Sequence, residues 1–280
     1  MPAAQLHLSF ELDHRGSTIL RVKTQQPPWR VIRGFDAPSG ERLAHLHNVS
    51  GGILDTDALE CRIDVARRAQ AQLTSTGATR VYRSRSPHSV ATQTARITLG
   101  EEAYFEYLPD QLIPFRGSRF EQNTRIHLAR GAAMIWWELI APGRDASGES
   151  FGYESLSSSF EISAMGEPVV IERWNILPRA RPLQSAVRLG PYRYFASCYA
   201  CRAGEASSYW RTFENHLRAL ADRRSGPDVS WGITSLRAHG LAVRGVAVTG
   251  RALTEGLVEF WSAAKWFLCG RVATLPRKVY

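Results

Sequence analysis

The chain has 280 residues, of which 44% are hydrophobic and 10% aromatic, so it can fill a sizeable core and is not disordered. The formal net charge is +9, and the 35 basic residues are 32 Arg and 3 Lys. This charge favours an acidic protein surface or a nucleic acid as partner, or reflects only the composition of the source genome. The arginines are scattered from Arg15 to Arg277, which argues against a basic tail that wraps DNA.

Targeting signals are not evident. Met1–Leu12 alternates apolar with polar residues and lacks the apolar core of a signal peptide. The longest strongly apolar stretch, Ala132–Ile140, contains Glu138 and is far shorter than the roughly 20 residues of a membrane span. Because no signal peptide is evident, we expect the four cysteines to be reduced thiols. We therefore expect a soluble, cytoplasmic protein with no membrane segment.

Alternation of apolar and polar residues dominates the first two-thirds of the chain and predicts β-strands. The predicted strands include Leu6–Leu12, Cys61–Val65, Tyr104–Leu108, Arg119–Leu128, Ser159–Ser163 and Val169–Arg173, with a turn at Gly166–Pro168 joining the last two. Proline and glycine breakers recur between strands, but there is no long linker. The pattern indicates one continuous, mainly β domain over residues 1–280.

Helical periodicity is clear only twice, both times near the C-terminus. Trp210, Phe213, Leu217 and Leu220 form one apolar stripe, with Ser207 and Ser208 ahead of it as N-cap candidates. A second stripe runs over residues 253–268, and Gly270 fits the position just past its end. Trp261, Trp266 and Phe267 make this second helix apolar over a wide arc, so we expect it to be deeply buried or docked on a partner.

Two spacings could carry metal or redox chemistry. Cys198-x-x-Cys201 has no second ligand pair for zinc and no βαβ context for a thioredoxin-type site, so we interpret it as two small residues at a strand end. His45-x-His47 places two imidazoles on one strand face, but a third ligand of matched spacing is missing. Phosphate-binding and nucleophile-elbow motifs do not occur. The sequence therefore predicts no catalytic residue, and we expect a protein that is not an enzyme.

Four segments occur in a fixed order in the first half of the chain. They are Asn48–Leu59, which holds the twin glycine Gly51-Gly52, then Thr79–Ser84, Tyr107–Phe120 and Trp136–Glu149. Taken alone, the twin glycine followed by Asp55 and Asp57 is only a weak sign of a phosphate or metal loop. Together the four segments resemble the urease accessory protein UreD family, called UreH in some bacteria, and looser similarity extends over nearly the whole chain. The chain departs from the family at Asp55-Thr56, where a glycine pair is usual, so we expect this loop to tolerate positive φ less well.

The resemblance implies a single-domain, β-helix-like stack of strands in two sheets, with about two helices toward the C-terminus. It also implies a maturation scaffold that forms a hetero-oligomer with UreF, binds the GTPase UreG through it, docks on apo-urease and assists Ni²⁺ delivery. No tightly bound cofactor is expected, and Ni²⁺ would be transient. A water-filled route for the metal through UreD-type proteins has been proposed. Whether nickel is held or only channelled stays open.

Acidic residues within the matching motifs are the candidates to line a nickel route or to dock a partner. They are Asp57, Glu106, Asp110, Glu138 and Glu149. The alternative for each is an ordinary hydrogen-bonded strand or loop residue.

Two other functions compete with the scaffold. A basic, β-rich nucleic-acid-binding protein would bind in a strongly salt-dependent way, but the scattered arginines lack an aromatic-rich RNA-binding signature. A metal or redox enzyme that uses Cys198 and Cys201 is ranked last. The expected partners are UreF, UreG and apo-urease, with no nucleic acid and no membrane.

Overall fold

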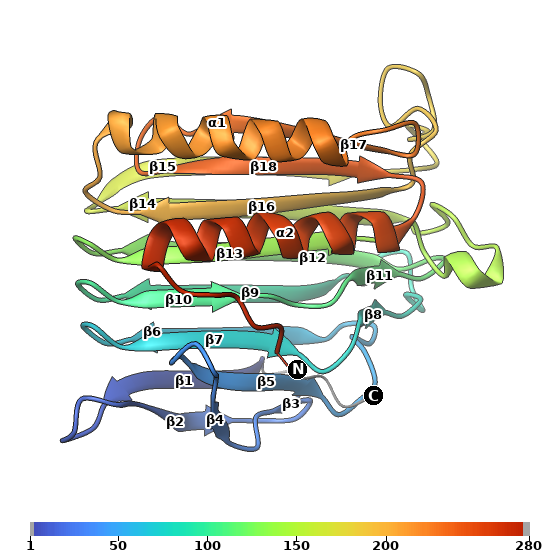
Figure 1. Ribbon diagram of the computed structural model, residues 1–280. Coiled ribbons are helices and arrows are strands. Elements are labelled where there is room, and N and C mark those ends of the chain that lie inside the picture. The colour runs from blue at the N-terminus through green and yellow to red at the C-terminus, as the bar shows by residue number, and fades with distance from the viewer. Residues whose placement is uncertain (1–2, 277–280) are drawn as a thin grey trace.

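The computed structural model describes residues 3–276, whose strands form two sheets packed face to face, with two helices over one of them (Figure 1). The first sheet, called sheet 1, has the strand order β15, β14, β12, β9, β6, β1, β2. Its strands are β1 (Ala4–Leu12), β2 (Thr18–Gln25), β6 (Ala58–Val65), β9 (Ala91–Leu99), β12 (Arg119–Leu128), β14 (Ser155–Ala164) and β15 (Glu167–Ile176).

The second sheet, sheet 2, has the main order β17, β18, β16, β13, β10, β7, β5, β3, with β4, β8 and β11 attached beside it. Its strands are β3 (Trp29–Arg30), β4 (Gly34–Asp36), β5 (Arg42–Asn48), β7 (Gln70–Ser75), β8 (Thr79–Val81), β10 (Tyr104–Tyr107), β11 (Leu112–Pro114), β13 (Ala133–Ile140), β16 (Tyr194–Arg202), β17 (Val229–Ser235) and β18 (Gly240–Ala247). The remaining elements are the 3₁₀ turn η1 (Asp145–Ser147) and the helices α1 (Ser207–Arg224) and α2 (Gly250–Cys269).

The chain winds through the two sheets in alternation. From β5 to β14 it passes back and forth between sheet 2 and sheet 1, so neighbouring strands in the middle of each sheet are parallel, and antiparallel pairs occur toward the ends. This is the predicted β-helix-like stack in two sheets, and the mainly β fold with two late helices is confirmed.

Sheet 1 shows why the alternating sequence produces this stack. Its parallel register aligns one aliphatic side chain per strand between the sheets, in a buried ladder formed by Leu8, Ile63, Ile97, Ile126 and Ile162. Residues one position away face the opposite side, because side chains alternate along a strand. A slip of one residue would bring polar side chains into the core, so the alternation fixes the register.

Stacked turns join successive strands at one end of the molecule. Arg68, Glu102 and Gly131 occupy equivalent turn positions with φ of 61°, 56° and 71°. Backbone bonds connect one turn to the next: Arg68 N–H donates to Glu101 O at 2.9 Å, and Glu102 N–H donates to Arg130 O at 3.0 Å. These bonds satisfy backbone groups that would otherwise lack partners where the strands end.

The predicted strands are all present, with corrected ends. The turn between β14 and β15 lies at Met165 and Gly166, so Pro168 belongs to the second strand. A register shift next to Ser163, which lies opposite Pro168, accommodates the proline, whose nitrogen cannot donate to the ladder.

Both helices pack on the outer face of sheet 2, as Figure 1 shows, α1 over β17 and α2 over β13 and β16. The N-cap prediction for α1 is wrong: the helix begins at Ser207, and Ala206 holds the N-cap position without a side-chain hydrogen bond. The prediction for the end of α2 is confirmed, because Gly270 adopts φ of 65° there. The apolar arc of α2 is narrower than expected, since Trp261 is fully buried but Trp266 is 62% exposed.

A buried cation fixes α2 to sheet 2. Lys265 Nζ lies 3.0 Å from Glu106 Oε1 on β10 and 3.2 Å from Glu41 Oε2, and none of the three side chains is exposed. Arg271 Nη1 approaches Glu41 Oε1 at 3.3 Å, so two cations balance two carboxylates.

Neutral donors complete this ion cluster. The Gln72 amide and the Tyr104 hydroxyl donate to Glu106, and Ser39 Oγ donates to Glu41 Oε2 at 2.6 Å. Burial alone raises the pKa of Glu41, but the Ser39 hydrogen bond and the Lys265 charge outweigh it and hold that pKa below its ordinary value. A buried charge that lost its partner would be left without compensation.

We predict that Lys265→Met lowers the free energy of unfolding by about 3–5 kcal/mol, because it leaves the buried Glu106 without a cation and leaves Glu41 with Arg271 alone. Adding Glu106→Gln to Lys265→Met should recover part of this loss. The control is Lys23→Met, which removes an exposed partner of Glu11 and should cost less than about 1 kcal/mol. Urea unfolding measures all three, and equal losses in Lys265→Met and Lys23→Met would contradict the role of the cluster.

Candidate functional site

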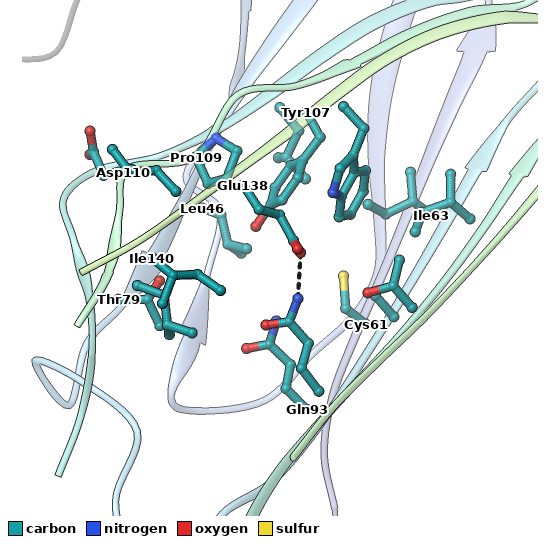
Figure 2. Close-up of a pocket in the computed structure, with 18 of the residues that line it drawn as sticks. Leu46, Cys61, Ile63, Thr79, Gln93, Tyr107, Pro109, Asp110, Glu138 and Ile140 are labelled. Carbon is teal, nitrogen blue, oxygen red and sulfur yellow. Dashed lines mark hydrogen bonds between the residues drawn. The ribbon is translucent and has the colours of Figure 1, made fainter. Parts of the chain in front are cut away.

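A cavity of about 60 Å³ lies between the two sheets (Figure 2). On the sheet 1 side its wall includes Cys61 of β6, Gln93 of β9 and Gln122 of β12. On the sheet 2 side it includes Tyr107 of β10 and Glu138 of β13. The strand period places these polar groups at positions that point inward, where aliphatic residues would otherwise fill the space. The rest of the wall is mainly apolar, but a cavity of this volume with several polar groups can hold a few water molecules.

Glu138 is the acidic group in the middle of this cavity. In Figure 2 its carboxylate points toward the glutamine side chains, and the Gln122 amide donates a hydrogen bond to it. Burial raises the pKa of Glu138 to about 7, and the nearby Glu172 charge adds to the rise, although the Gln122 hydrogen bond opposes it. Glu138 therefore changes its charge near neutral pH.

The thiol and the phenol of the wall stay neutral. Burial raises the pKa of the Cys61 thiol to about 12, so it is not a thiolate at neutral pH. Burial also raises the pKa of Tyr107. Glu138 therefore lies beside neutral thiol, phenol and amide groups, and Asp110 is the second carboxyl group of the wall.

Two larger hollows share walls with the cavity. One, of about 260 Å³, is bordered by Gly51 and Gly52 and shares Thr79, Gln93 and Tyr107 with the cavity. The other, of about 660 Å³, lies beside α2 and shares Pro109, Asp110 and Leu139 with the cavity. The cavity thus lies between a hollow at the twin-glycine loop and a hollow at the C-terminal helix.

Asp110 and Glu138 are the two predicted acidic residues that the structure brings to the same cavity. Asp110 lies at one margin of the group in Figure 2, and its backbone N–H donates to Ser75 Oγ at 2.8 Å. It also borders the hollow beside α2.

The other three predicted residues lie apart from the cavity wall. Asp57 Oδ2 accepts from Leu54 N–H at 2.8 Å and so closes the twin-glycine loop. Glu106 belongs to the ion cluster of Lys265. Glu149 is 3% exposed and accepts from both Nε and Nη2 of Arg144 at 2.8 Å. Each of these three carboxylates holds local structure.

The two cysteines of Cys198-x-x-Cys201 cannot act together. Cys201 is the last residue but one of β16 and Cys198 lies three residues before it, so their side chains point to opposite faces of sheet 2. Cys198 packs with the residues under the helices, and Cys201 packs between the sheets. Burial raises the pKa of both thiols, for Cys198 to about 12.

His45 and His47 share one face of β5, as predicted, and that face is half-buried. Both border an apolar hollow on the outer side of sheet 2, and the His45 ring meets Phe35 edge-on at 5.5 Å. Among residues 3–276, no three His, Cys, Asp or Glu side chains form a group that could hold a metal ion. No helix in this range is long and apolar enough to cross a membrane.

Sequence reasoning missed the glutamines of the cavity and the lysine of the ion cluster. Gln93 and Gln122 fall in phase with Ile97 and Ile126, so their inward direction could have been found from the strand period. Lys265 stands between Ala264 and Leu268 on the apolar stripe of α2, which was a visible sign of a buried charge.

We predict that Thr56→Gly raises the free energy of unfolding by about 1 kcal/mol, because a left-handed backbone costs a residue with a Cβ atom roughly that much. Thr56 adopts φ of 64°, so the loop needs positive φ even though the usual glycine is missing. The control Ser50→Gly lies in the same loop and should bring no gain. Urea unfolding compares the two, and no gain in Thr56→Gly would show that the backbone there is unstrained.

We also predict a pH-dependent gain from Glu138→Gln. Below pH 4.5 the carboxyl group is protonated in both states, and between 4.5 and about 7 only the unfolded state loses its proton, so stability falls over that window. Removing the group should therefore stabilise the protein more near pH 8 than near pH 5, by about 2 kcal/mol.

Urea unfolding at both pH values measures this gain. The control Glu121→Gln removes a solvent-facing carboxylate next to Gln122 and should give a difference that changes little with pH. A pH-independent effect of Glu138→Gln would mean that the carboxyl group titrates normally.

Comparison with known proteins places the chain in a family. The model of the UreD urease accessory protein family matches residues 2–280. The urease accessory protein UreD of Herpetosiphon aurantiacus is 40% identical over 276 residues, which cover 98% of this chain and 96% of that protein. UreD of Deinococcus radiodurans is 32% identical over 98% of this chain and 94% of its own length, and UreD of Opitutus terrae is 30% identical over 91% of each. The chain therefore belongs to the UreD family of urease accessory proteins, a family of urease maturation rather than of catalysis.

Proposed function

We propose that the chain is a scaffold of urease maturation that binds a UreF protein and, through it, the GTPase UreG. In this proposal the assembly docks on apo-urease, and Ni²⁺ passes through the chain on its way to the urease active site. The observation that carries the proposal is the position of Glu138, a carboxyl group in the cavity between the sheets whose pKa burial raises to about 7.

Glu138 suits a metal that must leave again. Oxygen ligands hold Ni²⁺ less firmly than thiolates or several imidazoles do, and a carboxyl group with a pKa of about 7 binds a metal in competition with a proton. The neutral amides of Gln93 and Gln122 can add weak oxygen contacts. Such a group supports passage of the ion rather than storage.

The neighbouring hollows supply the two ends of the proposed route. The ion would enter or leave beside the twin glycine, where a side chain on Gly52 would lie within 2.6 Å of Arg80 O and of the Tyr82 ring. It would pass Glu138 and reach the hollow beside α2 at Asp110. The acidic groups on this path attract a divalent cation even though the whole chain is positively charged.

We predict that Glu138→Gln lowers urease activation at limiting nickel by roughly tenfold, as removal of one group near a metal commonly does. The experiment complements a strain that lacks the gene for this chain and measures the nickel content and activity of urease. Added nickel should restore activity. The control Glu121→Gln faces solvent and should activate urease like the wild type. Equal activation by both variants would remove Glu138 from the route.

The scaffold itself is tested separately. The tagged chain should co-purify with the UreF and UreG homologues of the same cell, and its deletion should leave urease present but poor in nickel. Normal urease activity in a deletion strain grown at low nickel would refute the proposal.

A further inference from the structure

A basic hollow of about 510 Å³ lies at the end of the stack where β8 and β11 are found, to the right in Figure 1. Four separate segments bring arginines to it, and these are Arg83, Arg85, Arg116, Arg119, Arg144 and Arg179. Glu154 is the acidic residue among the described residues that line it. Six arginines and one acidic residue therefore line this hollow.

The guanidinium groups of three of these arginines form no salt bridge. Glu154 contacts Arg179 at 2.9 Å and Arg119 at 3.6 Å, and Arg144 pairs with Glu149 at the margin. Within residues 3–276, the guanidinium groups of Arg83, Arg85 and Arg116 form no salt bridge, and all three residues are exposed. Their contacts with carboxylates are made by the backbone: Arg85 N–H donates to Asp55 Oδ2 at 2.9 Å, and Arg116 N–H donates to Glu149. Like charges held together without counter-charges repel one another, so an anionic ligand would relieve the repulsion.

Two loops hold the unpaired arginines in place. Ser84 N–H donates to Gly117 O at 3.0 Å, and Ser84 Oγ accepts from Arg119 N–H at 3.1 Å. Gly117 adopts φ of 76°, and a Cβ atom there would lie 3.1 Å from Arg83 Cγ. On Gly152 a Cβ atom would lie 3.3 Å from the Arg116 stem. The stems therefore pack close against the backbone, which lowers the entropy cost of binding a ligand.

Aromatic rings form part of the same wall. Tyr82 and Phe115 meet edge-on at 5.1 Å, and the guanidinium carbon of Arg144 lies 4.8 Å from the centre of the Phe115 ring. Arginine beside tyrosine and phenylalanine is the composition of protein–protein contact sites. Arginine also pairs bidentately with carboxylates.

We propose that this basic hollow is the docking site for an acidic segment of a partner protein, one that alternates carboxylates with apolar side chains. The carboxylates would pair with Arg83, Arg85 and Arg116, and the apolar side chains would lie on Tyr82 and Phe115. A peptide fits better than a nucleic acid, because a strand of phosphates needs a continuous basic groove and Glu154 interrupts this one. The site goes beyond the proposed function, since it takes part in no step of nickel transfer and can be measured without nickel.

The test uses the full chain and a fluorescein-labelled peptide in which Glu alternates with Phe, followed by fluorescence anisotropy at low salt. The variant Arg83→Gln/Arg116→Gln should weaken binding about tenfold, as loss of two exposed charge pairs would. The control Arg96→Gln/Arg211→Gln removes the same charge from exposed positions outside the hollow and should change binding less than about twofold. The variant Arg83→Lys/Arg116→Lys keeps the charge and should bind between wild type and the glutamine variant.

Two further ligands test whether the hollow recognises carboxylates and whether it prefers a peptide to a nucleic acid. A peptide in which Gln alternates with Phe should not bind, and a single-stranded oligonucleotide should not displace the acidic peptide. The proposal is overturned if the glutamine variant binds like the wild type, if the control loses as much as the variant, or if the Gln peptide binds equally well. Displacement by the oligonucleotide that depends on Arg83 and Arg116 would overturn it in favour of a nucleic-acid site.

Discussion

The two sheets can pack against each other only if every second side chain of each strand fits between them. Because the strands are in parallel register, the inward positions of neighbouring strands are aligned. One aliphatic residue therefore lies beside the next, as in the ladder from Leu8 to Ile162. A polar residue at an inward position therefore has a cost unless it finds a partner. Gln93, Gln122 and Glu138 occupy such positions, and all three line the cavity.

The same alternation places a row of arginines on the outer face of sheet 1. On the outer face of sheet 1, Arg62, Arg96 and Arg125 lie in register on neighbouring parallel strands. Asp64 contacts Arg62 at 3.0 Å, and Glu161 contacts Arg125 at 3.3 Å, so this row is partly balanced. The basic hollow beside β8 and β11 is not balanced in this way. The arginines therefore fall into two groups: some pair with carboxylates on the outer face of sheet 1, and others gather in the basic hollow. The composition alone suggested only a general preference for acidic partners.

Most of the fold could be predicted from the sequence, because period-2 alternation reports directly which face of a strand is buried. Arg119–Leu128 was found to the residue for this reason. The start of α1 was wrong by one position, since two serines made an N-cap plausible and only the backbone shows that Ala206 takes that place.

The site was harder to predict, because motif membership does not tell a lining residue from a structural one. Asp57 and Glu149 have the same chemistry as Glu138, yet their carboxylates accept local backbone and arginine bonds. The three residues differ in the direction of the side chain and in the group that the carboxylate contacts in the folded chain. For Cys198 and Cys201 the strand period would have been enough, since a spacing of three residues in a strand sends the two thiols to opposite faces.

The helix α2 and the cavity share the same strands, and this connects stability to the proposed route. On β10, Glu106 faces α2 and binds Lys265, and the next residue, Tyr107, faces the cavity. On β13, the Trp137 ring meets Trp261 of α2 edge-on at 6.1 Å, and the next residue, Glu138, faces the cavity. Two adjacent strands thus carry a helix contact on one side and a cavity wall on the other.

A displacement of α2 would therefore move Tyr107 and Glu138 through the backbone of their own strands, without any direct contact between helix and cavity. The buried ion cluster resists such a displacement, because Lys265 cannot leave Glu41 and Glu106 without exposing or stranding three charges. A partner that binds near the exposed Trp266 would act on the helix that this cluster holds. The α2 helix is thus an element through which an outside contact could change the cavity wall.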